Sequence, residues 1–244
     1  MKISVLYMKA VLLAAGKGTR LLPLTVDTPK VLVEVNGKPF LWYVLEHLYL
    51  AGFDDIGLVV GYKKEKVAEF VKEYLVHQGG MKITLIHQDE QLGTGHAVLC
   101  AKVFVGQENF VVYSTDNLIS EEDLRALPMD DSDIYVMAMQ VQFPQRYGVL
   151  VHEGDRLKEI KEKPKEYYGN WVNAGIYKFT PQIFSLLEKV KLSVRGEIEV
   201  TDAVTMLAKL GKARILKLKE YWLDLGVKDD IPKVEAFLQR RGGG

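Results

Sequence analysis

The chain has 244 residues, of which 48% are apolar and 26% are charged, and its formal net charge is +0 at pH 7. These values are typical of a globular protein with a sizeable core, organised as one α/β domain or as two small ones. The balanced charge excludes an overall field that would attract nucleic acid or a membrane, so any attraction for phosphate must be local. The single cysteine, Cys100, excludes an internal disulfide framework and fits a reducing compartment, so we expect a cytoplasmic protein.

The amino-terminal residues resemble a signal peptide only superficially, because Lys9 interrupts the apolar run and no cleavage site is evident. We interpret residues 1–7 as an extension or a misassigned start. No apolar segment of the sequence is long enough to span a bilayer.

Apolar runs alternate with helical patterns from Ala10 to about Asp116. Strands are predicted over residues 10–13, 56–60, 83–86 and 110–113, and helices over residues 39–52, 63–75 and 94–104. Because these strands are apolar on both faces and helices lie between them, the pattern predicts a mostly parallel central sheet flanked by helices.

The pattern changes after Asp116. Strands are predicted over residues 134–141, 148–151, 157–160, 171–179 and 215–218, with a hairpin turn at residues 153–155. Helices are predicted after a cap at Ser120, from residues 180–181 to Val190, from a cap at Thr201 and Asp202 to Leu210, and over residues 228–238, before a frayed tail over residues 240–244. No repeat or low-complexity linker divides the chain, so we interpret the two halves as lobes of one domain.

The stretch from Leu13 to Arg20 carries the main chemical signal. An apolar strand opens there into small residues and two glycines, Gly16 and Gly18, which allow backbone N–H groups to point at a phosphate that comes near. Arg20 and Lys30 can bring positive charge to the same phosphates. The spacing is that of neither a Walker A loop nor the dinucleotide fingerprint, and an ordinary tight turn is the alternative for the two glycines alone.

Residues 13–21, followed by Thr28-Pro-Lys30 and Gly37-Lys-Pro39, resemble the signature of the sugar-1-phosphate nucleotidylyltransferases. This family includes the glucose-1-phosphate thymidylyl- and uridylyltransferases and the pyrophosphorylase half of the bifunctional N-acetylglucosamine-1-phosphate uridylyltransferase. The resemblance covers nearly the whole chain from Met8 onward and continues, in the family's order, through Gln88 to Thr94, Asp116, Arg146 to Gly148, Glu162 to Pro164 and Trp222 to Gly226.

The resemblance implies an α/β fold with a Rossmann-like, mostly parallel central sheet and an inserted sugar-binding lobe of strands and helices, as in nucleotide-diphospho-sugar transferases. Residues 1–244 would form a single nucleotidyltransferase domain. Within it, residues 8–118 would form the nucleotide-binding lobe, residues 119–226 the sugar-binding lobe with the second metal ligand, and residues 227–244 a carboxyl-terminal helix and tail.

The resemblance also implies the roles of individual residues. Nucleotide binding would involve Leu13, Ala14, Ala15, Gly16, Gly18, Thr19, Gln88, Gly93 and Thr94. Sugar binding would involve Gly148, Glu162 and Asn173, catalysis would involve Arg20, Lys30 and Lys163, and Mg²⁺ would be held by Asp116 and Asp224.

The residues themselves leave alternatives to these roles. Asp116 follows a strand, where ligands of open α/β sheets bind and a carboxylate can hold Mg²⁺, but a turn or a cap is an equal alternative. For Asp224, the alternative is an ordinary turn residue near Gly226. For Glu162 and Lys163, the alternative is a charged hairpin that is simply solvated. The amide of Gln88 can donate and accept, which suits uracil or thymine, and the alternative is an exposed polar residue.

Two departures from the family pattern bear on these roles. The family usually has Gly-Asp where this chain has Thr115-Asp116, so the backbone near the nucleotide is less open here. The bifunctional enzymes usually have asparagine at the position of Asp224, which favours the thymidylyl and uridylyl branch. His96 is interpreted as a structural residue in the first turn of a helix.

The implied reaction is an in-line displacement that transfers a nucleotidyl group from UTP or dTTP to a sugar 1-phosphate, with glucose 1-phosphate favoured. Two enzymatic alternatives remain, which are N-acetylglucosamine-1-phosphate uridylyltransferase activity and mannose-1-phosphate guanylyltransferase activity. The non-enzymatic alternative is a regulatory subunit that binds a nucleotide sugar without catalysis. The expected partners are the triphosphate and the sugar phosphate, without nucleic acid or membrane, and a homo-oligomer is compatible with the sequence. Because the chain ends soon after its last helix, we expect no β-helical acyltransferase domain.

Overall fold

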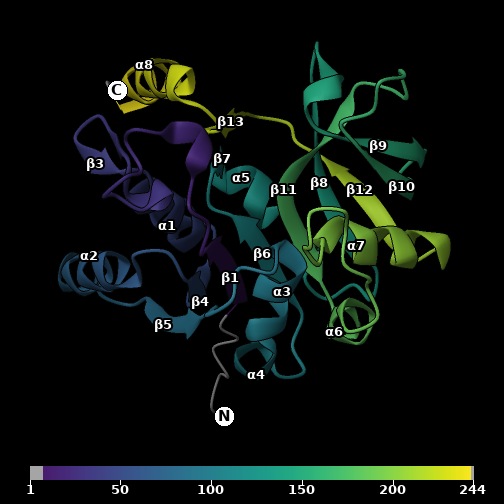
Figure 1. Cartoon of the computed structure of the whole chain (residues 1–244), viewed down its shortest axis with the longest axis horizontal. Coiled ribbons are helices and arrows are strands. Elements are labelled where there is room, and N and C mark those ends of the chain that lie inside the picture. The colour runs from purple at the N-terminus through teal and green to yellow at the C-terminus, as the bar shows by residue number, and fades with distance from the viewer. Residues whose placement is uncertain (1–7, 243–244) are drawn as a thin grey trace.

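A nine-stranded sheet runs through the part of the chain that the computed structural model describes, residues 8–242 (Figure 1). Its strands, in spatial order, are β5 (Lys82–His87), β4 (Phe53–Val60), β1 (Met8–Ala14), β6 (Phe110–Ser114), β11 (Trp171–Phe179), β8 (Ile134–Gln140), β12 (Ala213–Lys217), β10 (Arg156–Glu162) and β9 (Gly148–Glu153). The first four strands are parallel, as are β8 and β12, whereas β11, β10 and β9 pair antiparallel.

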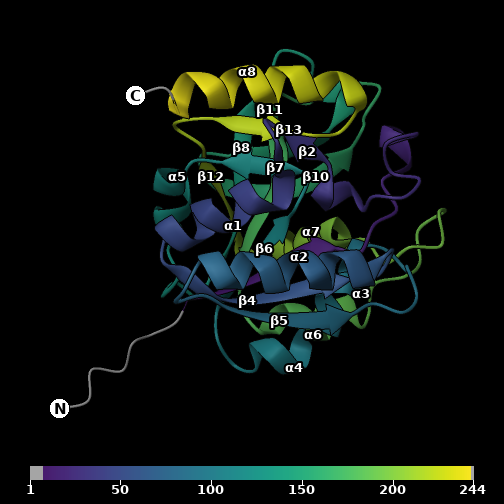
Figure 2. The same ribbon diagram turned by 90° about the vertical axis from the view of Figure 1, so that its left-hand side faces the viewer.

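Helices cover both faces of this sheet. They are α1 (Phe40–Leu50), α2 (Lys64–His77), α3 (Thr94–Cys100), α4 (Lys102–Val105), α5 (Glu121–Arg125), α6 (Gln182–Leu187), α7 (Val200–Lys209) and α8 (Ile231–Gly242). Figure 2 shows α1, α2 and α8 toward the viewer. Figure 1 shows α3, α6 and α7 near one another, from the centre to the lower right of the view. Among the described residues, no helix is both long and apolar enough to cross a membrane.

The side-chain alternation of β1 explains why both faces must be covered. Ala10, Leu12 and Ala14 pack into one core with α1 and α2, whereas Val11 packs into a second core with α3, α6 and α7. All four residues are buried, so the central strand contributes apolar surface to both sides of the sheet. The prediction of an α/β fold with a central sheet flanked by helices is confirmed, and its parallel part is β5-β4-β1-β6 together with β8 and β12.

The strand order β5-β4-β1-β6 indicates where a ligand would bind. The chain passes from β1 to β4 and β5 on one side and then returns to β6 on the other side of β1. In open α/β sheets, ligands bind beyond the carboxyl ends of the strands where the order reverses in this way. The carboxyl ends of β1 and β6, which are Ala14 and Ser114, therefore mark the expected crevice.

A small two-stranded sheet lies beside this crevice. It joins β7 (Asn117–Ile119) to β13 (Trp222–Asp224) in antiparallel pairing, and a second small sheet joins β2 (Glu34–Val35) to β3 (Lys38–Pro39). Four 3₁₀ turns complete the described elements, over Thr19–Leu21, Lys30–Leu32, Pro144–Arg146 and Lys228–Asp230. The β7–β13 pair brings two segments together that are more than 100 residues apart in the sequence.

Three predicted helices are wrong in their bounds. The helix expected over residues 94–104 is divided at Ala101 into α3 and α4, and the helix expected to reach Val190 ends at Leu187. The helix α7 begins at Val200, so Thr201 and Asp202 lie inside it rather than cap it. Its first N–H group, on Val200, is instead bound by the Thr94 hydroxyl at 3.2 Å, a long-range contact that takes over the role of a local cap.

The carboxyl-terminal helix also differs from its prediction. A 3₁₀ turn at residues 228–230 precedes α8, and Arg240 and Arg241, which were expected in a frayed tail, are helical. Residues 243–244 of that tail, and residues 1–7 with the start that we interpreted there, lie outside the described residues.

Candidate active site

A cavity of about 410 Å³ lies at the carboxyl ends of β1 and β6. It is lined by every predicted nucleotide-binding residue and by three of the predicted catalytic and metal-binding residues: Leu13, Ala14, Ala15, Gly16, Gly18, Thr19, Arg20, Lys30, Gln88, Gly93, Thr94 and Asp116. These residues come from the strand β1, the loop after it, the 3₁₀ turn at Lys30, the segment after β5, the start of α3 and the end of β6. The structure therefore brings together residues that are up to 103 positions apart, from Leu13 to Asp116.

The loop after β1 has the properties that a phosphate cradle requires. Gly18 has a φ of +64°, and a Cβ atom there would lie 2.7 Å from the Lys30 Cβ, so only glycine fits this close approach. Around Gly16 no atom would lie within 4 Å of an added Cβ, which leaves space for a ligand. Within residues 8–242, no hydrogen bond uses the backbone N–H of residues 16–18, so these donors are available to an anion.

Two contacts hold this loop in place. The Gln91 side chain donates a hydrogen bond to the Ala15 carbonyl at 2.8 Å, and the Thr25 hydroxyl donates one to the Gly18 carbonyl at 2.9 Å. Both bonds are accepted by loop carbonyl groups, whereas the N–H groups of residues 16–18 have no partner among the described residues. Sequence reasoning missed the role of Gln91, because nothing local links it to a residue 76 positions away.

The two predicted metal-binding carboxylates are brought side by side by β7 and β13. Asn117 on β7 pairs with Asp224 on β13, and the Leu225 N–H donates to the Asp116 carbonyl at 2.7 Å. Lys30 Nζ lies 2.7 Å from Asp116 Oδ2. Burial, and after it the negative charge of Asp116, raise the pKa of Asp224 to about 6, against the opposing charge of Lys30.

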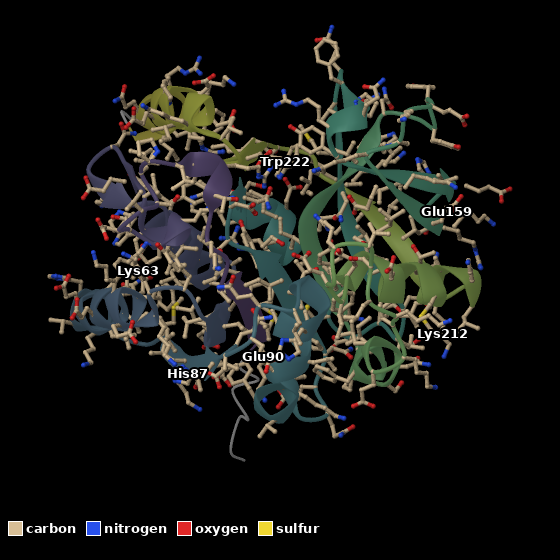
Figure 3. All side chains as sticks on the ribbon, viewed as in Figure 1. Lys63, His87, Glu90, Glu159, Lys212 and Trp222 are labelled. Atoms are coloured by element: carbon tan, nitrogen blue, oxygen red, sulfur yellow. The ribbon has the colours of Figure 1, made fainter. Side chains whose placement is uncertain are left out.

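Asn117 fixes the orientation of this pair and was missed by sequence reasoning. Its Nδ2 donates to Asp116 Oδ1 at 2.9 Å, and its Oδ1 accepts from the indole N–H of Trp222 at 2.8 Å. Figure 3 shows Trp222 between the two halves of the molecule. Asn117 is buried, so its amide can satisfy these partners without competition from water.

Asp123 stabilises the chain segment that leads to Asp224. This buried carboxylate on α5 accepts hydrogen bonds from the backbone N–H groups of Lys219 at 2.9 Å and Glu220 at 3.1 Å, and so holds the segment that leads into β13. The sequence showed Asp123 only as part of a local cap with Ser120, a bond that is present. Its long-range partners could not be predicted from that motif.

An adjoining cavity of about 290 Å³ lies on the other side of Arg20. Arg20 and Gly226 line both cavities, and Asp224, Trp222 and Arg146 line the second. The charge of Arg20 also lowers the pKa of Asp224, although by less than burial raises it. Arg20 therefore borders both the cavity that contains the glycine loop and the cavity that contains Asp224.

The predicted sugar-binding residues lie on the antiparallel part of the sheet. Gly148 on β9 is directly opposite Glu162 on β10, and a Cβ at residue 148 would lie 2.9 Å from Glu162 Oε1. Asn173 on β11 donates to the Tyr177 hydroxyl at 2.6 Å and accepts from the Gly175 N–H. Lys163 has a φ of +41° and donates its backbone N–H to the Tyr147 carbonyl at 3.0 Å. These four predicted residues line neither cavity, so their roles stay predictions.

The carboxylate pair fits a divalent cation. Among the described residues, no group of three or more His, Cys, Asp or Glu side chains could hold a metal. Mg²⁺ is commonly bound through one or two carboxylates together with water and substrate phosphates, and Asp116 and Asp224 are two such carboxylates. A cation between Asp116 and Asp224 would also remove the repulsion that raises the pKa of Asp224.

Replacing Asp224 by asparagine is expected to stabilise the metal-free protein at neutral pH. The raised pKa means that folding disfavours the ionised carboxylate, a cost that is absent below the unfolded value of 3.8 and complete above about 6. A difference of two pKa units corresponds to at most about 3 kcal/mol. Urea unfolding with chelator present should give Asp224→Asn the higher stability at pH 7.5 and equal stability at pH 4. A variant that is less stable than the parent at pH 7.5 would contradict this.

The parallel strands, the crevice at β1 and β6 and the glycine loop with free N–H groups define a nucleotide-binding α/β protein. A family model described as nucleotidyl transferase matches residues 9–241. The chain therefore belongs to the nucleotidyl transferase family, and the predicted resemblance to the sugar-1-phosphate nucleotidylyltransferases is confirmed.

The chain is also similar to individual proteins. The bifunctional protein GlmU of Methanocaldococcus jannaschii is 40% identical over 232 residues, which are 95% of this chain and 54% of that protein. The UTP–glucose-1-phosphate uridylyltransferase AglF of Haloferax volcanii is 37% identical over 239 residues, which are 95% of this chain and 97% of that protein. A crystal structure of UDP-glucose pyrophosphorylase in complex with UDP-glucose has a TM-score of 0.88 at 25% identity, and the match covers 96% of this chain and 99% of that one. The chain spans about half the length of the GlmU relatives that it matches.

Proposed function

We propose that this chain transfers a uridylyl or thymidylyl group from UTP or dTTP to a sugar 1-phosphate, most readily glucose 1-phosphate, and releases pyrophosphate. The observation that carries the proposal is the single cavity in which the glycine loop, Arg20, the Lys30–Asp116 pair and Gln88 converge. The likeness to AglF, which is named as a UTP–glucose-1-phosphate uridylyltransferase, supports the choice of nucleotide and sugar.

The reaction would be a single in-line displacement. An oxygen of the sugar phosphate attacks the α-phosphorus of the triphosphate, a new P–O bond forms, and the bond to the leaving pyrophosphate breaks. The attacking phosphate is already ionised at neutral pH, so no protein nucleophile or base is needed. Catalysis then consists of positioning and of charge stabilisation.

Each charged residue has a place in this scheme. The N–H groups of residues 16–18 bind the phosphates, and Arg20 stabilises the charge that develops on the leaving pyrophosphate. Lys30 contacts the α-phosphate with the N–H groups that its bond to Asp116 leaves free. Lys163 would bind the phosphate of the incoming sugar.

Asp116 and Asp224 would hold Mg²⁺ between them. When bound, this ion neutralises charge on the phosphate oxygens that surround the reacting phosphorus. Asn117 and Trp222 would hold the Asp116 carboxylate in place for this role, through the hydrogen bonds of 2.9 and 2.8 Å described above. In the sugar lobe, Glu162, Gly148 and Asn173 would bind the sugar hydroxyl groups.

A second acceptor is favoured by one observation. Lys17 and residues 91–96 resemble the bifunctional uridylyltransferases, so N-acetylglucosamine 1-phosphate is the second candidate. Asp224 favours the glucose enzymes instead. A non-catalytic regulatory subunit is disfavoured, because Arg20, Lys30 and both carboxylates are present.

A panel of triphosphates against sugar phosphates tests the proposal. UTP, dTTP, CTP and GTP would each be mixed with glucose 1-phosphate, N-acetylglucosamine 1-phosphate or mannose 1-phosphate in the presence of Mg²⁺, and pyrophosphate release would be followed. We expect the fastest release with UTP or dTTP and glucose 1-phosphate. Release from GTP with mannose 1-phosphate alone, or nucleotide binding without turnover in any combination, would contradict the proposal.

A further inference from the structure

The side chain of Gln88 is held at two points beside the nucleotide cavity. It is 4% exposed and follows the last residue of β5. Its Nε2 lies 3.1 Å from the Gly93 carbonyl oxygen and 3.0 Å from His96 Nδ1. The Gly93 carbonyl can only accept a hydrogen bond, so the amide atom that faces it must be the nitrogen and not the oxygen.

The contact with His96 accounts for the second amide proton. One proton of Nε2 is donated to Gly93, and the other points to His96 Nδ1. Two donors facing each other at 3.0 Å would repel, so Nδ1 must accept and the ring proton must lie on Nε2 of the imidazole. Both protons of the Gln88 amide are therefore used inside the protein.

The oxygen of the same amide is the part that remains available. In residues 8–242, Gln88 Oε1 takes part in no hydrogen bond, and it is not among the fully buried atoms without a partner, which belong to Asp54 and Asp55. Gln88 lines the cavity together with Gly93 and Thr94. A ligand in the cavity therefore meets Gln88 as a hydrogen-bond acceptor only.

The backbone that carries both partners of Gln88 is itself clamped. Gly93 has a φ of +96°, and a Cβ there would lie 2.7 Å from the Glu197 Cβ. The Ile198 N–H donates to the Leu92 carbonyl and the Gly95 N–H donates to the Ile198 carbonyl, both at 2.7 Å. The Gly93 carbonyl and the first turn of α3, where His96 lies, are thus fixed relative to Gln88.

We infer that His96 is a positioning residue for base selection, which keeps Gln88 an acceptor-only reader of the nucleobase. Uracil and thymine present an N–H at position 3 and match this acceptor, whereas cytosine presents a lone pair there and is rejected. The inference rests on the proposed function, because it concerns the base of the triphosphate in that cavity. Without His96, one amide proton would lose its partner and only the bond to the Gly93 carbonyl would oppose rotation of the amide, so the donor would be presented to cytosine more readily.

Four variants test this role. His96→Ala removes the acceptor, His96→Phe removes it while keeping a ring of similar volume, and His96→Asn restores an oxygen near the position of Nδ1. His87→Ala is the matched control, because His87 is an exposed histidine next to Gln88 at the end of β5 (Figure 3). The measurements are kcat and KM for UTP and CTP, the binding of each triphosphate without sugar phosphate, and thermal unfolding.

We expect His96→Ala and His96→Phe to raise the KM for UTP by about tenfold with little change in kcat, because a buried donor is left without its partner. The preference for UTP over CTP in kcat/KM should fall by about tenfold or more, as it does when a hydrogen-bonding site loses its complementarity. His96→Asn should retain most of the preference, and His87→Ala should match the parent. His96→Phe decides the case if His96→Ala does not fold.

Two results would overturn the inference alone, with the parent enzyme still active on UTP or dTTP. One is an unchanged preference for UTP over CTP in a folded His96→Phe or His96→Ala protein. The other is an equal loss of UTP and CTP turnover in all three His96 variants, which would assign His96 a merely structural role. A parent protein that neither binds nor uses any pyrimidine triphosphate would overturn the proposed function together with the inference.

Discussion

Asp116→Ala should lose most of the activity, by a factor of about 10² to 10³, while remaining folded. The substitution removes one of the two carboxylates available to a cation, and it also removes the partner that holds Lys30 Nζ at 2.7 Å. The lysine would then lose the contact that fixes its position for the role proposed at the α-phosphate. Initial rates of pyrophosphate release at saturating substrates, together with thermal unfolding, measure the two parts of this prediction.

A matched control separates this effect from the loss of any ion pair. Glu108 also lies 2.7 Å from a lysine, Lys9, but it is 53% exposed and does not line the cavity. Exposed ion pairs contribute little, so Glu108→Ala should keep nearly full activity. If Asp116→Ala retained near-normal rates of pyrophosphate release, Asp116 would have no place in the reaction.

The second large effect is expected for Arg20→Ala, which should lower kcat by about 10² to 10³. Arg20 lines both cavities, and in the proposed reaction its guanidinium stabilises the charge that develops on the leaving pyrophosphate. Because this charge develops in the transition state, kcat should fall more than KM for the triphosphate rises. The kcat of Arg20→Lys should lie between those of the parent and of Arg20→Ala, since lysine keeps the charge but not the paired N–H donors.

Arg240→Ala serves as the control for Arg20. Arg240 is an exposed arginine on α8 whose side chain donates to the nearby Ala236 carbonyl. Its removal should leave kcat and KM unchanged. A rise in KM without a change in kcat for Arg20→Ala would show that Arg20 binds the ground state equally well, and would remove it from the role assigned here.

The sequence was most informative where chemistry and backbone geometry depend on neighbouring residues. The turn from β1 into Gly16 and Gly18 could be predicted, because small residues directly after an apolar strand have few other uses. The strands β1, β4 and β6 follow the predicted runs closely for a similar reason, since burial on both faces requires continuous apolar residues. The parallel pairing of these strands then placed the crevice.

The parts that could not be predicted depend on contacts between distant segments. Asn117 joins Asp116 to Trp222, which is 105 residues away, and Gln91 supports Ala15 across 76 residues. No period or motif in a single sequence records such pairs. The start of α7 illustrates the same limit, because its cap comes from Thr94 rather than from Thr201 or Asp202.

His96 shows how a local pattern can leave out a partner that is brought close by the fold. In the sequence it is one polar residue in the first turn of a helix, and a structural role is the natural interpretation. The structure places its Nδ1 3.0 Å from the Gln88 amide, whose oxygen is left for a ligand. Local pattern gave the position of His96 on α3 but not its partner on the loop after β5.

The most direct test of the account is a measurement of pyrophosphate release from UTP with and without glucose 1-phosphate, each with Mg²⁺ or with chelator. The account predicts release only when the sugar phosphate and the divalent cation are both present, and loss of that release in the Asp116→Ala protein. Release that continues without a sugar phosphate, or that survives removal of all divalent cations, would contradict the proposal that this cavity joins a nucleotide to a sugar phosphate beside a pair of carboxylates.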